Sequence, residues 1–140
     1  MNRCDDAARR CARGRNPPNV KLNELLERAD DLYRERGRTD SVSESIDLLK
    51  GARPESSADR YEIDWRLSRG FFFVGQEAEG RVRKVACHRD GVSSGARAAK
   101  TAPSRVDGHF WLGVNLALLA EASGGLRGAV AVLRARRALH

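Results

Sequence analysis

One helical register recurs three times along this chain of 140 residues. A bulky residue is followed three positions later by a small residue, and three positions further by a second bulky one. The copies are Leu26-Ala29-Leu32, Trp65-Ser68-Phe71 and Phe110-Gly113-Leu116. Each copy opens a segment with helical periodicity, and a second helical segment follows it. Self-similar helix pairs are typical of a solenoid, so the register directs the question of function to a partner rather than to a reaction.

The apolar periodicity and the stop signals predict an all-α protein of six helices in three antiparallel pairs. The first pair is expected at about 21–36 and 40–52, before Pro54. The second pair begins at possible N-caps in 56–59, runs past Val74 and continues at about 79–100. The third begins at Ser104, where Asp107 completes a capping-box-like pair, runs to about 122 and resumes at 126.

These helices define the expected domain organisation. Residues 1–20 are expected to be a flexible basic arm that ends at a double proline. Residues 21–140 are expected to form one repeat domain of about three helix pairs. The last helix is still amphipathic where the sequence stops, and it has no following partner for its apolar face. We therefore expect the third pair to be truncated, or to pair with another molecule.

The charge of the chain leaves two interpretations open. The net charge is +7, from 26 basic and 19 acidic residues. The stretch 81–105 holds seven basic residues and a single acid, Asp90. These residues either form a solvated, Arg-biased surface or bind an anionic partner. The candidates for nucleic-acid or anionic-surface binding are Arg81, Arg83, Lys84, Arg89, Arg97 and Lys100.

The sequence gives no signal for catalysis, for a cofactor or for a metal. It has no phosphate loop, no GxSxG elbow and no HExxH motif. The three cysteines, at positions 4, 11 and 87, are odd in number and irregularly spaced, which argues against a disulfide framework. Cys87-His88 lacks the spacing and the further ligands of a zinc site. The longest uncharged apolar run, 110–120, is too short to span a bilayer.

The repeated register resembles the tetratricopeptide repeat, in which a Leu-Gly-like pair in the first helix precedes an aromatic residue. Leu112-Gly113 matches that pair directly, Leu67-Ser68 matches it with Ser in place of Gly, and Arg28-Ala29 departs from it. The small member lets two helices cross closely. The loose matches in the second helix are Gly91, Gly95 and Ala98, and Pro103 fits the proline that closes a repeat.

The spacing of the repeats suggests a branch of this group. Ala29 and Ser68 are 39 residues apart and Ser68 and Gly113 are 45 apart, against about 34 in the regular repeat. Such irregular repeats look like the helical T-component of bacterial tripartite (TRAP-type) periplasmic transporters, to which the run 109–116 is similar. This resemblance implies a periplasmic or lipid-anchored protein that assembles with a substrate-binding partner. Cys11 would mark the start of the mature lipoprotein.

The start of the chain as given points to another compartment. The residues before Cys11 are not apolar, and no export signal is visible. The chain as given is therefore expected to be cytoplasmic.

The candidate binding residues are chosen by their position on the first helix of each pair. They are Arg66, Arg69, His109, Trp111 and Asn115. Asn115 lies in an apolar helix, where it hydrogen-bonds either a bound peptide or a neighbouring helix. Trp65 and the run 71–73 could stack on a ligand, but at helical spacing we interpret them as core.

Three hypotheses follow. The first is a non-enzymatic scaffold that binds a protein or peptide in the concave groove of a short tetratricopeptide-like solenoid, as an accessory component of a periplasmic solute-uptake system. The second is a basic helical protein that binds nucleic acid or an anionic surface. The third is a subunit that completes its core by oligomerisation through the last helix.

Overall fold

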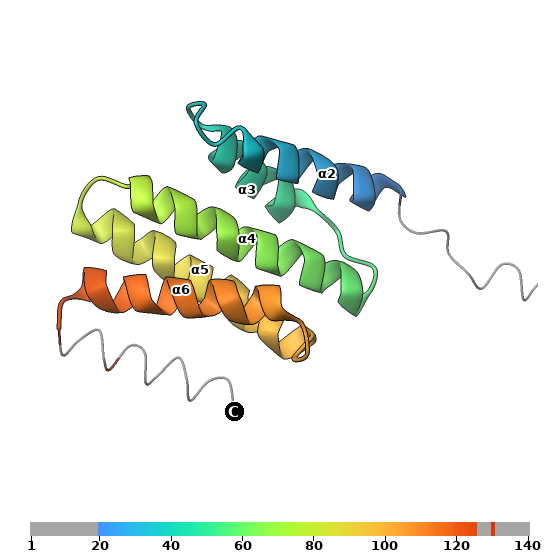
Figure 1. Ribbon diagram of the computed structural model, residues 1–140. Helices are drawn as coiled ribbons and strands as arrows, with labels where there is room; N and C mark the ends of the chain where they lie inside the picture. The colour runs from blue at the N-terminus through green and yellow to red at the C-terminus, as the bar shows by residue number, and fades with distance from the viewer. Residues whose placement is uncertain (1–19, 126–129, 131–140) are drawn as a thin grey trace, which may run out of the picture.

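The computed structural model describes residues 20–125 and residue 130, and the described part is all-α without strands. The helices are α2 (Val20–Arg34), α3 (Ser41–Gly51), α4 (Ser57–Glu77), α5 (Arg81–Thr101) and α6 (Val106–Ser123) (Figure 1). These five helices confirm the predicted order and nearly the predicted bounds. The predicted arm at 1–20 lies, apart from its last residue, outside the described residues. So does the predicted last helix, apart from residue 130.

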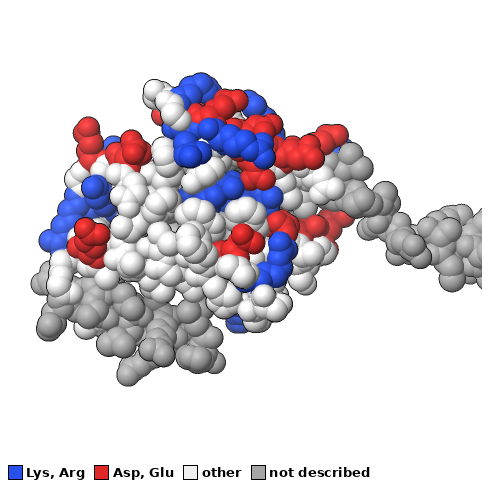
Figure 2. All heavy atoms as spheres, in the orientation of Figure 1, with Lys and Arg blue, Asp and Glu red and all other residues white. Residues whose placement is uncertain are grey.

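The helices form two layers, with α2, α4 and α6 side by side in one and α3 and α5 behind them (Figure 1). Consecutive helices pack as antiparallel hairpins, and α6 packs on both α5 and α4. On the face seen in Figure 2, charged side chains crowd over α2, whereas the surface over α4 and α6 is largely uncharged. None of the described helices is long and apolar enough to cross a membrane.

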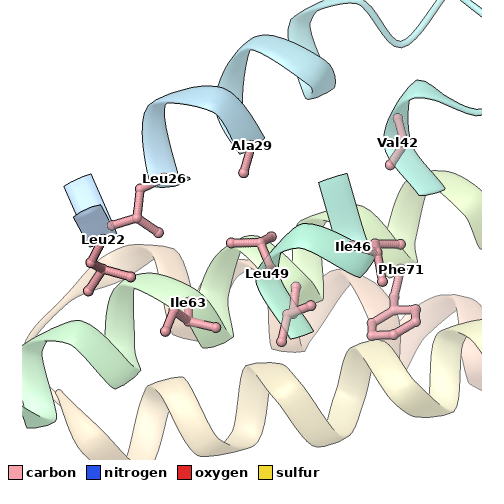
Figure 3. Close-up of a cluster of buried hydrophobic side chains, with 9 residues drawn as sticks. Leu22, Leu26, Ala29, Val42, Ile46, Leu49, Ile63 and Phe71 are labelled. Carbon is pink, nitrogen blue, oxygen red and sulfur yellow. The ribbon is translucent and has the colours of Figure 1, made fainter. Parts of the chain in front are cut away.

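A hydrophobic cluster joins α2, α3 and α4 (Figure 3). Its buried members are Leu22, Leu26, Ala29, Val42, Ile46, Leu49, Ile63, Leu67 and Phe71. Burying each large aliphatic or aromatic side chain contributes roughly 1.5–3 kcal/mol. Ala29 is fully buried, and its carbonyl oxygen accepts a hydrogen bond of 2.9 Å from Ser45 Oγ on α3. The small residue of the first register copy therefore lies where two helices cross closely, as predicted.

Small residues also permit the close packing of α4, α5 and α6. Ser68 is fully buried, and its hydroxyl donates to the Gly91 carbonyl oxygen at 2.7 Å. A Cβ atom on Gly95 would lie 2.8 Å from Ser68 Oγ and 2.9 Å from the backbone of Leu112. A Cβ atom on Gly108 would lie 2.9 Å from the backbone nitrogen of Ala99. The small residues of α5 are thus contact points, which confirms their predicted role.

The third copy of the register does not face the core. Gly113 is exposed and has open space around its Cα, and Phe110 is 55% exposed. The expectation that Gly113 marks a close helix crossing is therefore wrong. The buried positions of α6 are instead Gly108, Leu112, Asn115 and Leu119. Because α6 is apolar on nearly every side, apolar spacing could not identify its buried face.

The helix N-termini agree with the sequence at one helix and differ at another. Ser56 and Asp59 form a capping box on α4, with Ser56 Oγ accepting from the Asp59 backbone N–H at 3.1 Å. The predicted capping pair of Ser104 and Asp107 is wrong. Arg105 occupies the N-cap position of α6 without a side-chain cap. The Asp107 carboxylate instead accepts a hydrogen bond of 3.4 Å from the hydroxyl of Tyr61 on α4.

Two glycine-to-alanine substitutions test this packing. We expect Gly91→Ala to lower the free energy of unfolding by about 1–3 kcal/mol, because the new methyl group would overlap the Asn115 side chain. Gly113→Ala is the matched control, and it should raise that free energy by up to about 1 kcal/mol through helix propensity alone. Urea unfolding followed by circular dichroism measures both. Equal effects of the two substitutions would contradict the packing described here.

Candidate functional site

Most aromatic side chains lie on the outer face of the first helices rather than in the core. Of the eight aromatic residues, only Tyr61 and Phe71 are buried. The other six, which we call the aromatic face, are Tyr33, Trp65, Phe72, Phe73, Phe110 and Trp111. Five of these are half-buried and Phe110 is exposed. The interpretation of Phe71 as a core residue is confirmed, and half-buried Phe73 packs against the same core cluster. Trp65 and Phe72 are half-buried outside that cluster, so the interpretation is wrong for these two.

The aromatic side chains touch one another across neighbouring helices. The ring centroids of Phe72 on α4 and Trp111 on α6 are 5.4 Å apart, and Phe110 meets Trp111 edge-on at 5.0 Å. Tyr33 on α2 meets Phe73 on α4 edge-on at 6.3 Å. Such pairs add about 0.5–1.5 kcal/mol each beyond the area they bury. These contacts form two groups, one between α2 and α4 and the other between α4 and α6.

Two of the predicted arginines lie within this face and are held by carboxylates. Arg66 Nη2 lies 2.9 Å from the Asp30 carboxylate, and Arg66 Nη1 lies 2.6 Å from that of Glu62. Arg69 Nη2 contacts Asp30 at 2.5 Å, and Arg105 contacts Glu62. Both Arg66 and Arg69 side chains are only 13% exposed. An ion-pair chain thus runs from α2 across α4 to the start of α6.

The same arginines stack on aromatic rings. The Arg69 guanidinium carbon lies 4.0 Å from the ring centroid of Tyr33 and 5.0 Å from that of Trp65. The Arg66 guanidinium carbon lies 4.3 Å from the Trp65 centroid. Cation–π contacts of this kind contribute about 0.5–2 kcal/mol. Carboxylates on the edge and rings on the flat side leave the two guanidinium groups little freedom to move.

The carboxylates of this chain have shifted pKa values. Burial alone would raise the pKa of Asp30, but the hydrogen bonds and charges of Arg66 and Arg69 outweigh it and lower this pKa below its usual value. Burial also opposes the shift at Glu62, where hydrogen bonds from Trp65, Arg105 and Arg66 lower the pKa. Both groups are therefore ionised at neutral pH, and they neutralise the two arginines of the face.

The structure separates the remaining candidates. Trp111 belongs to the aromatic face. His109 is exposed at the start of α6, where its Nε2 lies 2.8 Å from the carbonyl oxygen of Pro103. Asn115 is fully buried, and its Nδ2 donates to the carbonyl oxygens of Ser68 and Trp111, both at 3.0 Å. The alternative of an asparagine bonded to a neighbouring helix is thus the observed one, and Asn115 has no surface to offer a partner.

The sequence pattern pointed to Trp65, Phe72 and Phe73 only as possible ligand-stacking residues, and it gave no indication that Tyr33, Asp30 and Glu62 belong to the site. A signal for the α4 members was present. Positions 62, 65, 66, 69, 72 and 73 form a second stripe at helical spacing, opposite the buried stripe. No sequence pattern predicted that α2 contributes to the site, because Asp30 and Tyr33 are distant from α4 along the chain and meet it only in the folded protein.

The basic residues of the second hypothesis lie along α5, and two of them are already engaged. Arg97 donates to the buried Asp64 carboxylate at 3.0 and 3.1 Å. Arg81 donates to the carbonyl oxygens of Ala122 and Ser123 at 2.9 and 2.6 Å. Cys87 is half-buried, and burial, aided by the charge of Asp90, raises the pKa of its thiol. Residues 20–125 hold no cluster of His, Cys, Asp and Glu suited to a metal ion.

Comparison of the chain with models of known protein families, with curated proteins and with solved structures gives no match. The described geometry is therefore the basis for assigning a function.

The ion-pair chain gives a testable dependence of stability on pH. The folded-state pKa of Asp30 is lowered, so its stabilising contribution is present above the unfolded pKa near 3.8 and is lost as pH falls through the folded value. We expect Asp30→Asn to cost about 1–3 kcal/mol at pH 7, because it leaves two half-buried arginines underpaired. That difference from the wild type should shrink below about pH 4, where Asp30 becomes protonated in the unfolded chain, and should shrink further as pH falls through the lower folded-state pKa.

Urea unfolding of wild type and variant at pH 7, 5 and 3 measures this effect. Asp31→Asn is the control, because Asp31 is the next residue on α2 and pairs only with the exposed Arg34. It should cost little at any pH. A cost for Asp30→Asn that stays constant down to pH 3 would show that Asp30 does not act through its charge.

Proposed function

We propose that this chain is a non-enzymatic helical scaffold that binds an apolar segment of another protein on its aromatic face. One observation carries the proposal, namely that six of the eight aromatic residues on α2, α4 and α6 are only half-buried or exposed, although two of them, Tyr33 and Phe73, also pack against the core cluster. A chain with few aromatic residues gains most stability by burying them. Keeping them at the surface favours a role in binding.

The chemistry of the face resembles that of protein interfaces. Aromatic residues and arginine are enriched at the centres of interfaces, where they supply most of the binding energy. Here Trp65, Trp111 and Arg69 are already held by their neighbours, so binding loses little further side-chain entropy. The preformed surface supports recognition by shape and apolar contact.

The charge balance of the face indicates the kind of partner. Arg66, Arg69 and Arg105 are all paired with Asp30 and Glu62, so this ion-pair chain of three arginines and two carboxylates has a net charge of only +1. The surface over α4 and α6 is largely uncharged (Figure 2). A largely apolar platform whose charges are paired internally fits a segment with large apolar side chains better than a highly charged one. His109, exposed beside this face, would contribute a rim contact.

The finer family assignment is also a proposal. Two layers of antiparallel hairpins support a short tetratricopeptide-like solenoid, and the irregular repeat spacing supports a T-component of a solute-uptake system. The Leu112-Gly113 pair lends no support, because Gly113 lies at the surface. The proposal of an interaction scaffold does not depend on this assignment, since the aromatic face carries it alone.

Tryptophan fluorescence offers a direct test, because both tryptophans of the chain belong to the aromatic face. Peptides selected from a random library against the folded protein should be rich in apolar side chains and should shift the emission of Trp65 and Trp111. We expect Trp111→Ala to weaken binding by about tenfold or more, the loss of a typical interface anchor. Emission from Trp65 remains as the readout in that variant.

Val82→Ala is the matched control, because Val82 is 83% exposed on α5, away from this face. Its affinity should equal that of the wild type, and circular dichroism should show both variants folded. Selection of acidic peptides whose binding falls steeply with salt would instead favour the basic surface of α5. Peptides that bind Trp111→Ala as well as wild type would overturn the proposed site.

A further inference from the structure

A cavity of about 400 Å³ lies where the start of α5 meets the end of α6. The lining residues are Gln76, Gly80, Arg81, Lys84, His88, Leu118, Glu121 and Ala122. Three basic side chains in this lining, at positions 81, 84 and 88, share one face of α5 by their helical spacing. The cavity is separate from the aromatic face, and none of the functions considered above uses it.

The tautomer of His88 is set by the side-chain amide of Asn115. The Asn115 amide donates through Nδ2 to two backbone carbonyl oxygens, so its Oδ1 is the atom that faces His88 Nδ1, at 3.1 Å. An amide oxygen can only accept, so Nδ1 of His88 carries the hydrogen. In the neutral form of an imidazole with the hydrogen on Nδ1, the lone pair is on Nε2. Among the described residues, Nε2 has no hydrogen-bond partner, although His88 is only 2% exposed.

The electrostatics of the cavity favour an anion. Gly80 is the N-cap of α5 with φ 82°, and no side chain caps this helix. The uncapped N-terminus of a 21-residue helix carries a partial positive charge. Arg81 is fixed by its bonds to the last carbonyl oxygens of α6, and Lys84 has no ion-pair partner among the described residues. The positive end of α5 and the Lys84 ammonium thus both border the cavity.

We propose that this cavity binds a small oxyanion that still carries a proton, of which hydrogen phosphate is the representative. The charged oxygens accept from Lys84 and from the N-terminus of α5, and the remaining P–OH donates to His88 Nε2. The Glu121 carboxylate on the cavity wall repels negative charge, so it disfavours the fully deprotonated form of the ligand. An oxyanion without a proton has no hydrogen to donate, so the lone pairs of its oxygen atoms would repel the lone pair of His88 Nε2.

Three probes at pH 7.5 separate the possible ligands. Inorganic phosphate keeps a proton at this pH, whereas sulfate keeps none and a simple monoester such as methyl phosphate loses its last proton near pH 6. Titrations followed by NMR of the imidazole carbons report binding at His88. Exposed His109 and the histidine at 140 are removed by substitution to Gln, which leaves His88 as the sole signal. Phosphate should shift this signal at concentrations where sulfate and methyl phosphate do not.

Two lysine variants test the site. We expect Lys84→Gln to weaken phosphate binding by about tenfold, the effect of losing one charge-assisted hydrogen bond. Lys100→Gln removes the same charge near the other end of α5 and should leave the affinity unchanged. Equal binding of sulfate would overturn the proton-selective site. If both variants weaken phosphate binding equally, phosphate is attracted only by the net charge of the protein. If phosphate does not shift the His88 signal, it does not bind in this cavity.

Discussion

The side-chain amide of Asn115 is the constraint on which the packing of α4, α5 and α6 depends. It bonds Ser68 on α4, His88 on α5 and the Trp111 carbonyl on its own helix, and all its side-chain atoms are buried. A buried polar group left without a partner costs about 1–3 kcal/mol, so the helices must hold the positions that satisfy it. Because the amide has distinct donor and acceptor ends, each partner has only one possible role.

This junction also explains where the aromatic residues lie. The space between the three helices is filled by Ser68, Gly91, Gly95 and Gly108, and a single Cβ added at these glycines would already overlap a neighbour. An aromatic side chain is larger than a methyl group, so it cannot fit at these glycine positions either. Only Phe71, facing α3, and Tyr61, which bonds Asp107 and the Gly108 backbone, are buried. The remaining six aromatic side chains are half-buried or exposed, and Tyr33 and Phe73 among them pack against the cluster of α2, α3 and α4.

The sequence predicted the helices well and their orientation less well. Periodicity and the prolines at 54 and 103 located all five described helices, including α5 with its many glycines, because those glycines make contacts instead of breaking the helix. The buried face of α6 was not predictable, since a helix that is apolar on all sides has no preferred direction. Helical spacing likewise could not tell the buried stripe of α4 from the outer stripe that holds Trp65 and Phe72.

The net charge of +7 is a poor guide to what this surface recognises. On the aromatic face, Arg66 and Arg69 form ion pairs with carboxylates and stack on aromatic rings. Their guanidinium groups are therefore held in place beside the apolar surface. At the start of α5, by contrast, Lys84 forms no ion pair among the described residues, and no side chain caps the helix N-terminus. The two surfaces meet at Asn115, whose amide bonds the Trp111 carbonyl at one end and His88 at the other. A change in position of either neighbour must therefore be accommodated by the same amide, which makes the junction the physical link between the two proposed sites.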